Sequence, residues 1–203
     1  MFCMKKRNCK NKRLQKIIIG LGNPGEKFKK NRHNIGFLIC DGILKKLDNF
    51  ESEIKFFGQI YKINYKKCCK NKGVLIVKPL TCMNESGKCV KEIINNYPIS
   101  LNNLLVIQDD MDLNLGRVKF KLGGGSAGHK GVESIIDKLS DENFCRLRFG
   151  IGRPPEGIDP VDYVLEDFIN KELRLVKESM RDIVKAVLDY IKIDIKFVME
   201  KYN

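Results

Sequence analysis

The residues that could do chemistry begin with a histidine downstream of a short apolar run. The run Ile17–Leu21 predicts a buried strand, and the turn after it carries Asn23 and leads to His33. The 203 residues contain only two histidines. Side chains at strand ends are held rigidly yet reach solvent, and imidazole gains or loses a proton near neutral pH. His33 is therefore the first candidate for a general base.

Two other predicted strand ends offer partners for this histidine. Leu104–Ile107 is followed by Asp109, and Val74–Val77 leads into a loop with Asn84. Loops at the carboxyl ends of strands form the site in an open α/β sheet, so we expect these side chains to meet. A carboxylate can fix the imidazole tautomer while amides hold a water or an oxyanion. Since no G-x-S-x-G nucleophile motif occurs, attack by activated water is the simplest scheme.

The same residues could instead have purely structural or metal-binding roles. His33 could be a structural histidine at a helix start, and Asn23 could be an ordinary turn residue. Asn84 could cap a helix, and the acidic cluster over residues 109–112 could bind a divalent cation. The residue types alone leave these alternatives open.

The spacing of the glycines and cysteines argues against several kinds of binding site. Gly20–Gly25 lacks the spacing of a dinucleotide fingerprint, and its Pro24 stands where the helix should begin. Gly123–Gly131 could cradle phosphate with backbone amides, but it lacks the G-K-[ST] ending of a nucleotide P-loop. The eight cysteines form no C-x-x-C, and neither histidine completes a zinc pattern. We expect a reducing compartment, no metal and no other cofactor, with Cys40 and Cys89 buried as small hydrophobes.

Strand and helix patterns alternate along the chain. Apolar stripes predict helices after His33, from a cap at Ser86, after Gly131 and over Leu173–Ile191. Further strands are predicted at Phe57–Tyr65, Arg117–Leu122 and Leu147–Ile151. Some strand-to-strand steps are too short for a crossover helix. The pattern predicts an α/β fold, a single-domain three-layer sandwich with a mixed, mostly parallel twisted sheet flanked by helices.

Composition and charge limit the partners. The chain is 43% hydrophobic and has no apolar run of about 18 residues, so we expect no membrane span and a cytoplasmic location. Of the net charge of +13, seven cations without an acid lie in residues 1–16. We interpret 1–16 as a basic, disordered extension; a nucleic-acid arm or an organelle transit peptide has the same character. The +6 that remains on 17–203 favours a polyanionic partner.

Taken together, these blocks resemble the bacterial-type peptidyl-tRNA hydrolases. The order and spacing of the blocks agree from about residue 16 to the end. The matching stretches are Gly20–Gly25, Arg32–Gly36, Lys78–Lys88, Asp109–Leu113, Lys119–Gly125, Gly128–Gly131 and Arg146–Gly152.

The resemblance implies a monomeric, metal-free α/β catalytic domain over residues 17–203. The implied reaction cleaves the ester between peptide and tRNA in peptidyl-tRNA and recycles the tRNA. His33 aligns with the family's catalytic base and Asp109 with its supporting carboxylate. Asn84 aligns with an amide that contacts substrate and positions the water. Asn23 aligns with an asparagine that distinguishes blocked from unblocked aminoacyl ends.

The resemblance also implies a tRNA-binding rim that contacts the acceptor stem and the 3′ end. Lys121 and Arg148 align with basic residues that clamp the 5′ phosphate region. Three rim positions depart from the family pattern: Phe28 replaces a tyrosine, Cys82 a common aromatic, and Lys130 an asparagine.

Two other functions compete with this enzyme. A non-catalytic RNA-binding relative would keep the basic surface, but it would not need His33 and Asp109 together. An esterase for small acyl substrates would not need the basic charge. The joint presence of the dyad and the charge favours the hydrolase of peptidyl-tRNA.

Overall fold

Seven strands form the middle layer of the part of the chain that the computed structural model describes, residues 14–47, 49–64 and 73–203. The sheet order is β2-β3-β4-β1-β5-β7-β6. Its centre, from β4 to β7, is parallel, and the β2, β3 and β6 edges are antiparallel. The strands are β1 Leu14–Gly20, β2 Phe50–Lys55, β3 Gly58–Asn64, β4 Gly73–Pro79, β5 Leu104–Asp110, β6 Val118–Leu122 and β7 Cys145–Gly150.

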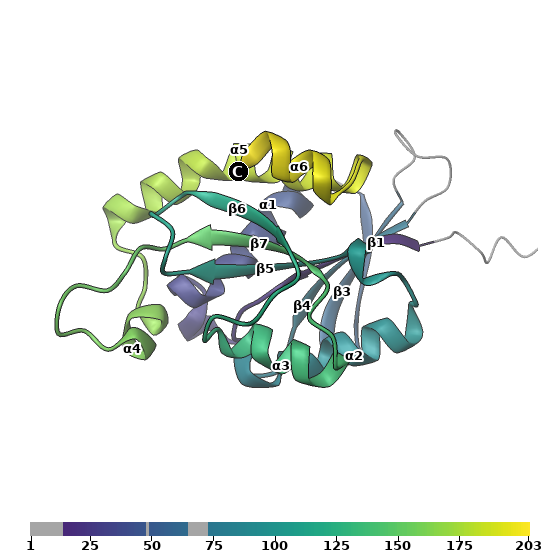
Figure 1. Cartoon of the computed structure of the whole chain (residues 1–203), viewed down its shortest axis with the longest axis horizontal. Coiled ribbons are helices and arrows are strands. Elements are labelled where there is room, and N and C mark those ends of the chain that lie inside the picture. Colours follow the sequence, from purple (N-terminus) through teal and green to yellow (C-terminus); the bar gives the residue numbers. More distant parts are fainter. Residues whose placement is uncertain (1–13, 48, 65–72) are drawn as a thin grey trace, which may run out of the picture.

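Helices cover both faces of this sheet, as the predicted sandwich requires (Figure 1). On one face lie α1 Ile35–Leu47, α5 Asn170–Lys192 and α6 Ile195–Tyr202. On the other face lie α2 Ser86–Asn96 and α3 Lys130–Leu139. Alternate residues of β5 enter the two resulting cores: Leu105 and Ile107 pack on the α1 side, and Leu104 and Val106 on the α2 side. The short α4, Pro160–Leu165, lies at one end of the sheet (Figure 1).

The start of α1 sits against the strand ends. A Cβ at Gly36 would overlap the backbone of Leu21 and Ile107, so only glycine allows this approach. A single 3-10 turn over Arg32–Asn34 precedes the helix. This close packing brings His33 to the carboxyl end of β5.

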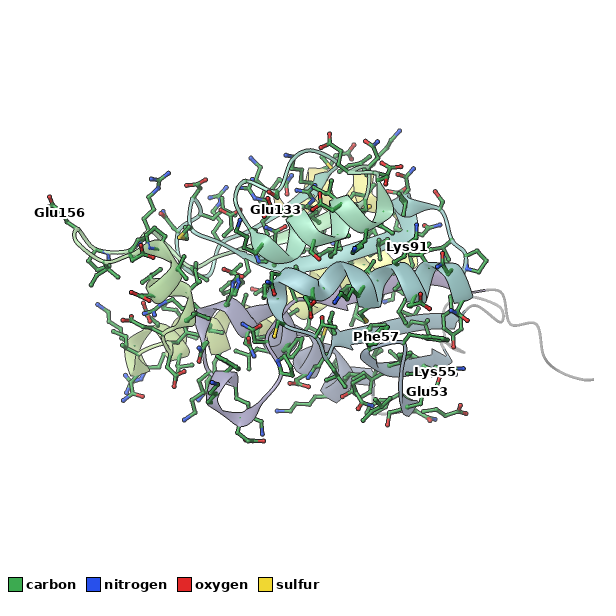
Figure 2. All side chains as sticks on the ribbon, turned by 90° about the horizontal axis from the view of Figure 1, so that it is seen from below. Glu53, Lys55, Phe57, Lys91, Glu133 and Glu156 are labelled. Atoms are coloured by element: carbon green, nitrogen blue, oxygen red, sulfur yellow. The ribbon has the colours of Figure 1, made fainter. Side chains whose placement is uncertain are left out.

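Several sequence expectations need correction. Ser86 does not cap α2, because it is the first helical residue and its hydroxyl donates to the Met83 carbonyl oxygen at 2.8 Å. Phe57 lies outside β3, in the turn of a β2–β3 hairpin, where Phe56 and Phe57 both have positive φ. The strand β2 and the helices α4 and α6 were not predicted. Figure 2 shows Glu53 and Lys55 of β2 at the margin of the molecule.

The boundary of the basic extension also moves. β1 begins at Leu14, so residues 14–16 belong to the fold. Lys16 is buried, with its ammonium 4.2 Å from the centre of the Tyr190 ring. Residues 1–13, which carry the rest of that prediction, lie outside the described residues, as does Tyr65. No helix of the described part is long and apolar enough to cross a membrane.

Two cysteines confirm their predicted role as small hydrophobes. Cys40 on α1 and Cys89 on α2 are buried. Burial raises the pKa of both thiols to about 12, so they stay protonated and unreactive at neutral pH.

Candidate active site

A cavity of about 690 Å³ opens at the carboxyl ends of the strands. Six of the predicted site residues line this cavity, although they come from four separate segments of the sequence. These residues are Asn23, His33, Cys82, Asn84, Asp109 and Lys130. Asn23, His33, Asn84 and Asp109 thus meet as expected from the convergence of strand ends. Cys82 and Lys130, which were predicted from the family resemblance, line the same cavity.

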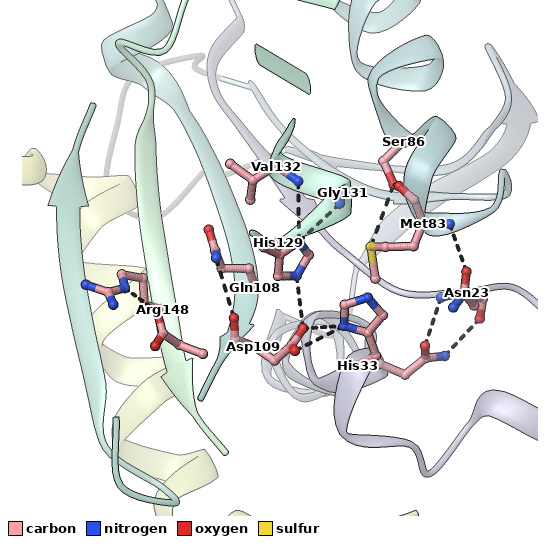
Figure 3. A network of polar contacts seen from close by, with 12 residues as sticks. Asn23, His33, Met83, Ser86, Gln108, Asp109, His129, Gly131, Val132 and Arg148 are labelled. Atoms are coloured by element: carbon pink, nitrogen blue, oxygen red, sulfur yellow. Dashed lines mark hydrogen bonds and ion pairs between the residues drawn. The ribbon is translucent and has the colours of Figure 1, made fainter. Parts of the chain in front are cut away.

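His33 and Asp109 form a buried imidazole–carboxylate pair. Nδ1 of His33 lies 2.9 and 3.0 Å from the two carboxylate oxygens of Asp109 (Figure 3). A carboxylate can only accept, so Nδ1 carries the hydrogen in the neutral imidazole. Nε2 has no partner among the described residues. His33 thus presents an unprotonated ring nitrogen at the cavity wall.

His129 is a second imidazole partner of Asp109 that the sequence did not reveal. Its Nε2 lies 3.0 Å from Asp109 Oδ1. Its Nδ1 caps α3 by accepting from the backbone N–H groups of Gly131 and Val132, at 3.1 and 3.4 Å. An acceptor Nδ1 leaves the hydrogen on Nε2, so His129 donates to Asp109 (Figure 3).

The two imidazoles control the charge of Asp109. Burial, which leaves this residue 4% exposed, would raise the pKa of its carboxyl. The interactions with His129 and then His33 outweigh burial and hold the pKa well below its usual range. The carboxylate therefore remains ionised at any pH at which a neutral imidazole can act as a base.

The side chains of this trio are of metal-ligand types, with ligand atoms within 4.8 Å of one another. A metal at Nε2 of His129 would move the ring hydrogen to Nδ1. Nδ1 already faces two backbone N–H donors, so the hydrogen would meet donors instead of acceptors. The capping contact thus favours a hydrogen-bonded trio over a metal centre.

Asn23 joins three loops of the site. Its backbone N–H donates to Oδ1 of Asn34 at 2.8 Å, and its carbonyl accepts from Nδ2 of Asn34 at 2.9 Å. Its own Oδ1 accepts from the N–H of Met83 at 2.8 Å. These bonds fix the Asn23 side chain (Figure 3) and leave its Nδ2 without a partner among the described residues.

The remaining predicted residues of the cavity are more exposed. Asn84 follows Met83, and its side chain bonds to none of the described residues. Cys82 is an exposed free thiol at the same wall. Lys130 is exposed and donates to Glu133 at 3.0 Å on the outer surface of α3 (Figure 2).

Three predicted rim residues do not line the cavity. Arg148 pairs with Asp110, the neighbour of Asp109. Lys121 packs its ammonium against Gly124 in the glycine-rich loop. Phe28 is half-buried, with the Lys27 ammonium 4.7 Å from its ring centre. A substrate that reached all three would have to extend beyond the cavity.

A basic face connects the cavity with the β6 edge of the sheet. Lys119 and Lys121 on β6 pair in register with Arg148 and Arg146 on β7. Side chains in register share a face of the sheet, so the four cations lie together. Arg146 is buried and donates to the Gly125 carbonyl oxygen at 2.7 Å. We call the other three cations, Lys119, Lys121 and Arg148, the basic face.

Arg32 connects the cavity wall at α4 to the segment that carries His33. That wall includes Val161, Val164 and Leu165 of α4. The buried Arg32 guanidinium donates to Glu172 at 2.9 Å and to the Tyr163 carbonyl at 3.2 Å. The guanidinium also stacks 4.2 Å from the Tyr163 ring centre. Arg32 was not a predicted site residue, although it directly precedes His33.

An imidazole base held by a carboxylate, beside an open cavity at the strand ends of an α/β sandwich, is the arrangement of a hydrolytic enzyme. The chain belongs to the peptidyl-tRNA hydrolase family, because the family model described as "Peptidyl-tRNA hydrolase" matches residues 17–203. The resemblance in the sequence is thereby confirmed.

Individual relatives agree with this assignment. The chain is 44% identical to a peptidyl-tRNA hydrolase of Mycoplasma mycoides, over 93% of this chain and 100% of that protein. It is 38% identical to one of Aquifex aeolicus, over 93% and 96%. The crystal structure of peptidyl-tRNA hydrolase from Acinetobacter baumannii superposes with a TM-score of 0.84 at 28% identity, covering 94% of this chain and 96% of that one.

Proposed function

We propose that this protein hydrolyses the ester that joins the peptide to tRNA in peptidyl-tRNA and so returns the tRNA for reuse. The observation that carries the proposal is the His33–Asp109 pair with Nε2 of His33 unoccupied at the cavity wall. Membership of the family supports the substrate. Translation in the cytoplasm would supply that substrate.

The placement of these groups supports the following reaction. Nε2 of His33 takes a proton from water while the water oxygen attacks the ester carbonyl carbon. The carbonyl oxygen becomes an oxyanion, for which the unpartnered amide N–H groups of Asn23 and Asn84 are the available donors. The imidazolium, stabilised by Asp109, then returns its proton to the departing 3′ oxygen of the ribose. Water is consumed, and the products are free tRNA and the carboxylic acid of the peptide, which releases its proton to solvent at neutral pH.

His129 acts in this scheme as a positioning residue. It donates to Asp109 Oδ1, and its ring is fixed by two backbone amides of α3. The carboxylate cannot rotate without losing one of its two imidazole donors. His33 is thereby held in the tautomer that keeps Nε2 free to accept a proton.

The tRNA would extend from the cavity over the basic face. Lys121 and Arg148 would clamp the 5′ phosphate region of the acceptor stem, since their cations lie beyond the cavity rim. Cys82 and Lys130 would border the 3′ end of the tRNA. Phe28 would add a stacking surface outside the cavity. We propose that the protein acts as a monomer.

The test of this function uses purified protein and N-acetylaminoacyl-tRNA, with EDTA present. We expect release of the N-acetylamino acid, while free aminoacyl-tRNA and small acyl esters remain nearly uncleaved. Binding of tRNA without release would instead support the RNA-binding relative. Rapid cleavage of small acyl esters would support a general esterase.

A further inference from the structure

Gln108 is a buried amide at the cavity wall that takes no part in the proposed reaction. It precedes Asp109 on β5 and pairs in register with Arg148 on β7. Its side chain is among those lining the cavity, yet the residue is only 4% exposed. Figure 3 shows it on the side of Asp109 turned away from His33.

The hydrogen bonds of this amide are incomplete. Its Nε2 makes one long contact, 3.4 Å to the carbonyl oxygen of its neighbour Asp109. Its Oε1 is buried and has no donor among the described residues. Leaving a buried acceptor unpaired costs stability, and such groups are rare in native proteins. A loosely held amide with a spare acceptor at a cavity wall is typical of a group that binds substrate.

We propose that Gln108 is a specificity-determining residue whose Oε1 accepts a hydrogen bond from the terminal nucleoside of the tRNA. This inference rests on the proposed function. The donor is an N–H or O–H of that nucleoside, either the free ribose 2′-hydroxyl or the 6-amino group of the terminal adenine. The weak 3.4 Å contact lets the amide turn toward the cavity at little cost.

The position of Gln108 favours the nucleoside over the peptide. Its register partner Arg148 belongs to the basic face, so Gln108 lies on the side where phosphates would approach. The cavity wall at α4, in contrast, is apolar and suits peptide side chains. The terminal nucleoside connects the phosphates to the ester, which places its hydroxyl and amine next to Gln108.

The experiment compares wild type with Gln108→Met, which keeps the side-chain length and removes the amide. The KM for N-acetylaminoacyl-tRNA should rise about 3- to 10-fold, which corresponds to one lost hydrogen bond, with kcat nearly unchanged. The melting temperature should not fall, because the variant buries no unpaired acceptor. Gln108→Leu is the second variant should Gln108→Met fold poorly.

Thr81→Val is the matched control. Oγ1 of Thr81 is also buried without a partner among the described residues, but Thr81 does not line the cavity. Its removal should leave KM unchanged. An equal rise of KM in Thr81→Val would overturn the inference.

Two altered substrates identify the donor. One ends in 2′-deoxyadenosine and the other in purine riboside, which lacks the 6-amino group. With wild type, one of the two altered substrates should have a KM raised by the same factor as the Gln108→Met substitution raises the KM for the normal substrate. With Gln108→Met, that altered substrate should have the same KM as the normal substrate. The inference is overturned when the KM of Gln108→Met for the normal substrate equals that of wild type. It is also overturned when each altered substrate raises KM by the same factor in wild type and in Gln108→Met. Failure of wild type to cleave the normal substrate would instead contradict the proposed function.

Discussion

Asp109 is the residue around which the two imidazoles of the candidate active site are arranged. Its carboxylate accepts hydrogen bonds from Nδ1 of His33 and Nε2 of His129. The ring centres of the two histidines lie 4.9 Å apart. Both imidazoles donate a hydrogen bond to the Asp109 carboxylate. The tautomer of His33 is set by the carboxylate, which can only accept, and that of His129 by the backbone N–H groups at the start of α3, which can only donate. The charge of Asp109 is thus part of the folded structure as well as of the mechanism.

The lowered pKa of Asp109 predicts how stability depends on pH. The folded-state pKa lies below the ordinary value of 3.8, so the unfolded state binds more protons in that range. The stabilisation is therefore fully present above 3.8 and is lost as the pH falls through the folded-state value. Between about pH 5 and 3, the free energy of unfolding should fall more steeply in wild type than in Asp109→Asn.

Denaturant unfolding at several pH values in this range measures the difference. Parallel pH profiles for the two proteins would contradict the stabilised carboxylate.

At this scale, sequence reasoning found the residues that follow apolar strands. His33, Asp109, Asn23 and Asn84 were predicted because strand ends converge. His129 was missed because its role depends on a helix cap made by an imidazole, for which serine, threonine and aspartate are the usual signals. A glycine-rich loop gave no indication that its histidine turns back to β5.

At the scale of elements, the site depends on how α4 is attached to the His33 segment. Arg32 binds Glu172 of α5 and the Tyr163 carbonyl of α4. Asn31 adds a bond from its side-chain amide to the Leu165 carbonyl. These contacts fix the α4 wall of the cavity relative to His33.

Arg32→Met should destabilise the fold by about 3 kcal/mol, because it removes a buried guanidinium and leaves the half-buried Glu172 carboxylate without its cation. The Glu172 side chain is only 18% exposed, and that of Arg32 only 5%. The matched control is Arg153→Met, which removes a pair with Asp112 whose side chains are 79% and 55% exposed. That control should change stability by less than about 1 kcal/mol.

Urea unfolding at neutral pH gives both free energies. Equal, small losses in the two variants would show that Arg32 does not tie α4 to the fold. A large loss in Arg32→Met alone is the expected result.

Two of the elements that were not predicted, β2 and α4, lack a periodic pattern of apolar residues in the sequence. β2 is exposed on nearly every residue, so it shows no alternation of apolar and polar residues. Its turn places Phe56 and Phe57 at positive φ, where glycine or asparagine would be the usual signal. α4 has six residues, too few for a helical period. The central strands and the longer helices carry buried stripes and were predicted.

At the scale of the whole molecule, the distribution of charge matches a nucleic-acid substrate. The domain over 17–203 keeps a surplus of +6, and the basic face lies beside the cavity. The cavity alone is too small to hold a tRNA, so we propose that affinity also comes from this wider surface. Composition predicted the sign of the charge, but only the strand register reveals which cations lie together.

Phosphate contacts on this face predict a salt-dependent affinity. The logarithm of the tRNA association constant should fall linearly with the logarithm of the salt concentration, as contacts release counterions. Lys121→Ala should reduce that slope by about 1. The control is Lys177→Ala, which should keep the wild-type slope. Lys177 lies on α5, which covers the face of the sheet opposite to the basic face. Titrations by fluorescence anisotropy check this, and identical slopes in all three proteins would remove Lys121 from the tRNA-binding surface.

The most direct test of the central claim is the single-turnover hydrolysis of N-acetylaminoacyl-tRNA by His33→Ala. The tRNA affinity should stay near that of wild type, because His33 transfers protons in the proposed reaction and is not one of the residues proposed to bind the tRNA. The hydrolysis rate should fall by about 10²-fold or more, and added imidazole should restore part of it in this variant but not accelerate wild type. A His33→Ala rate within a few-fold of wild type would contradict His33 as the base that activates water.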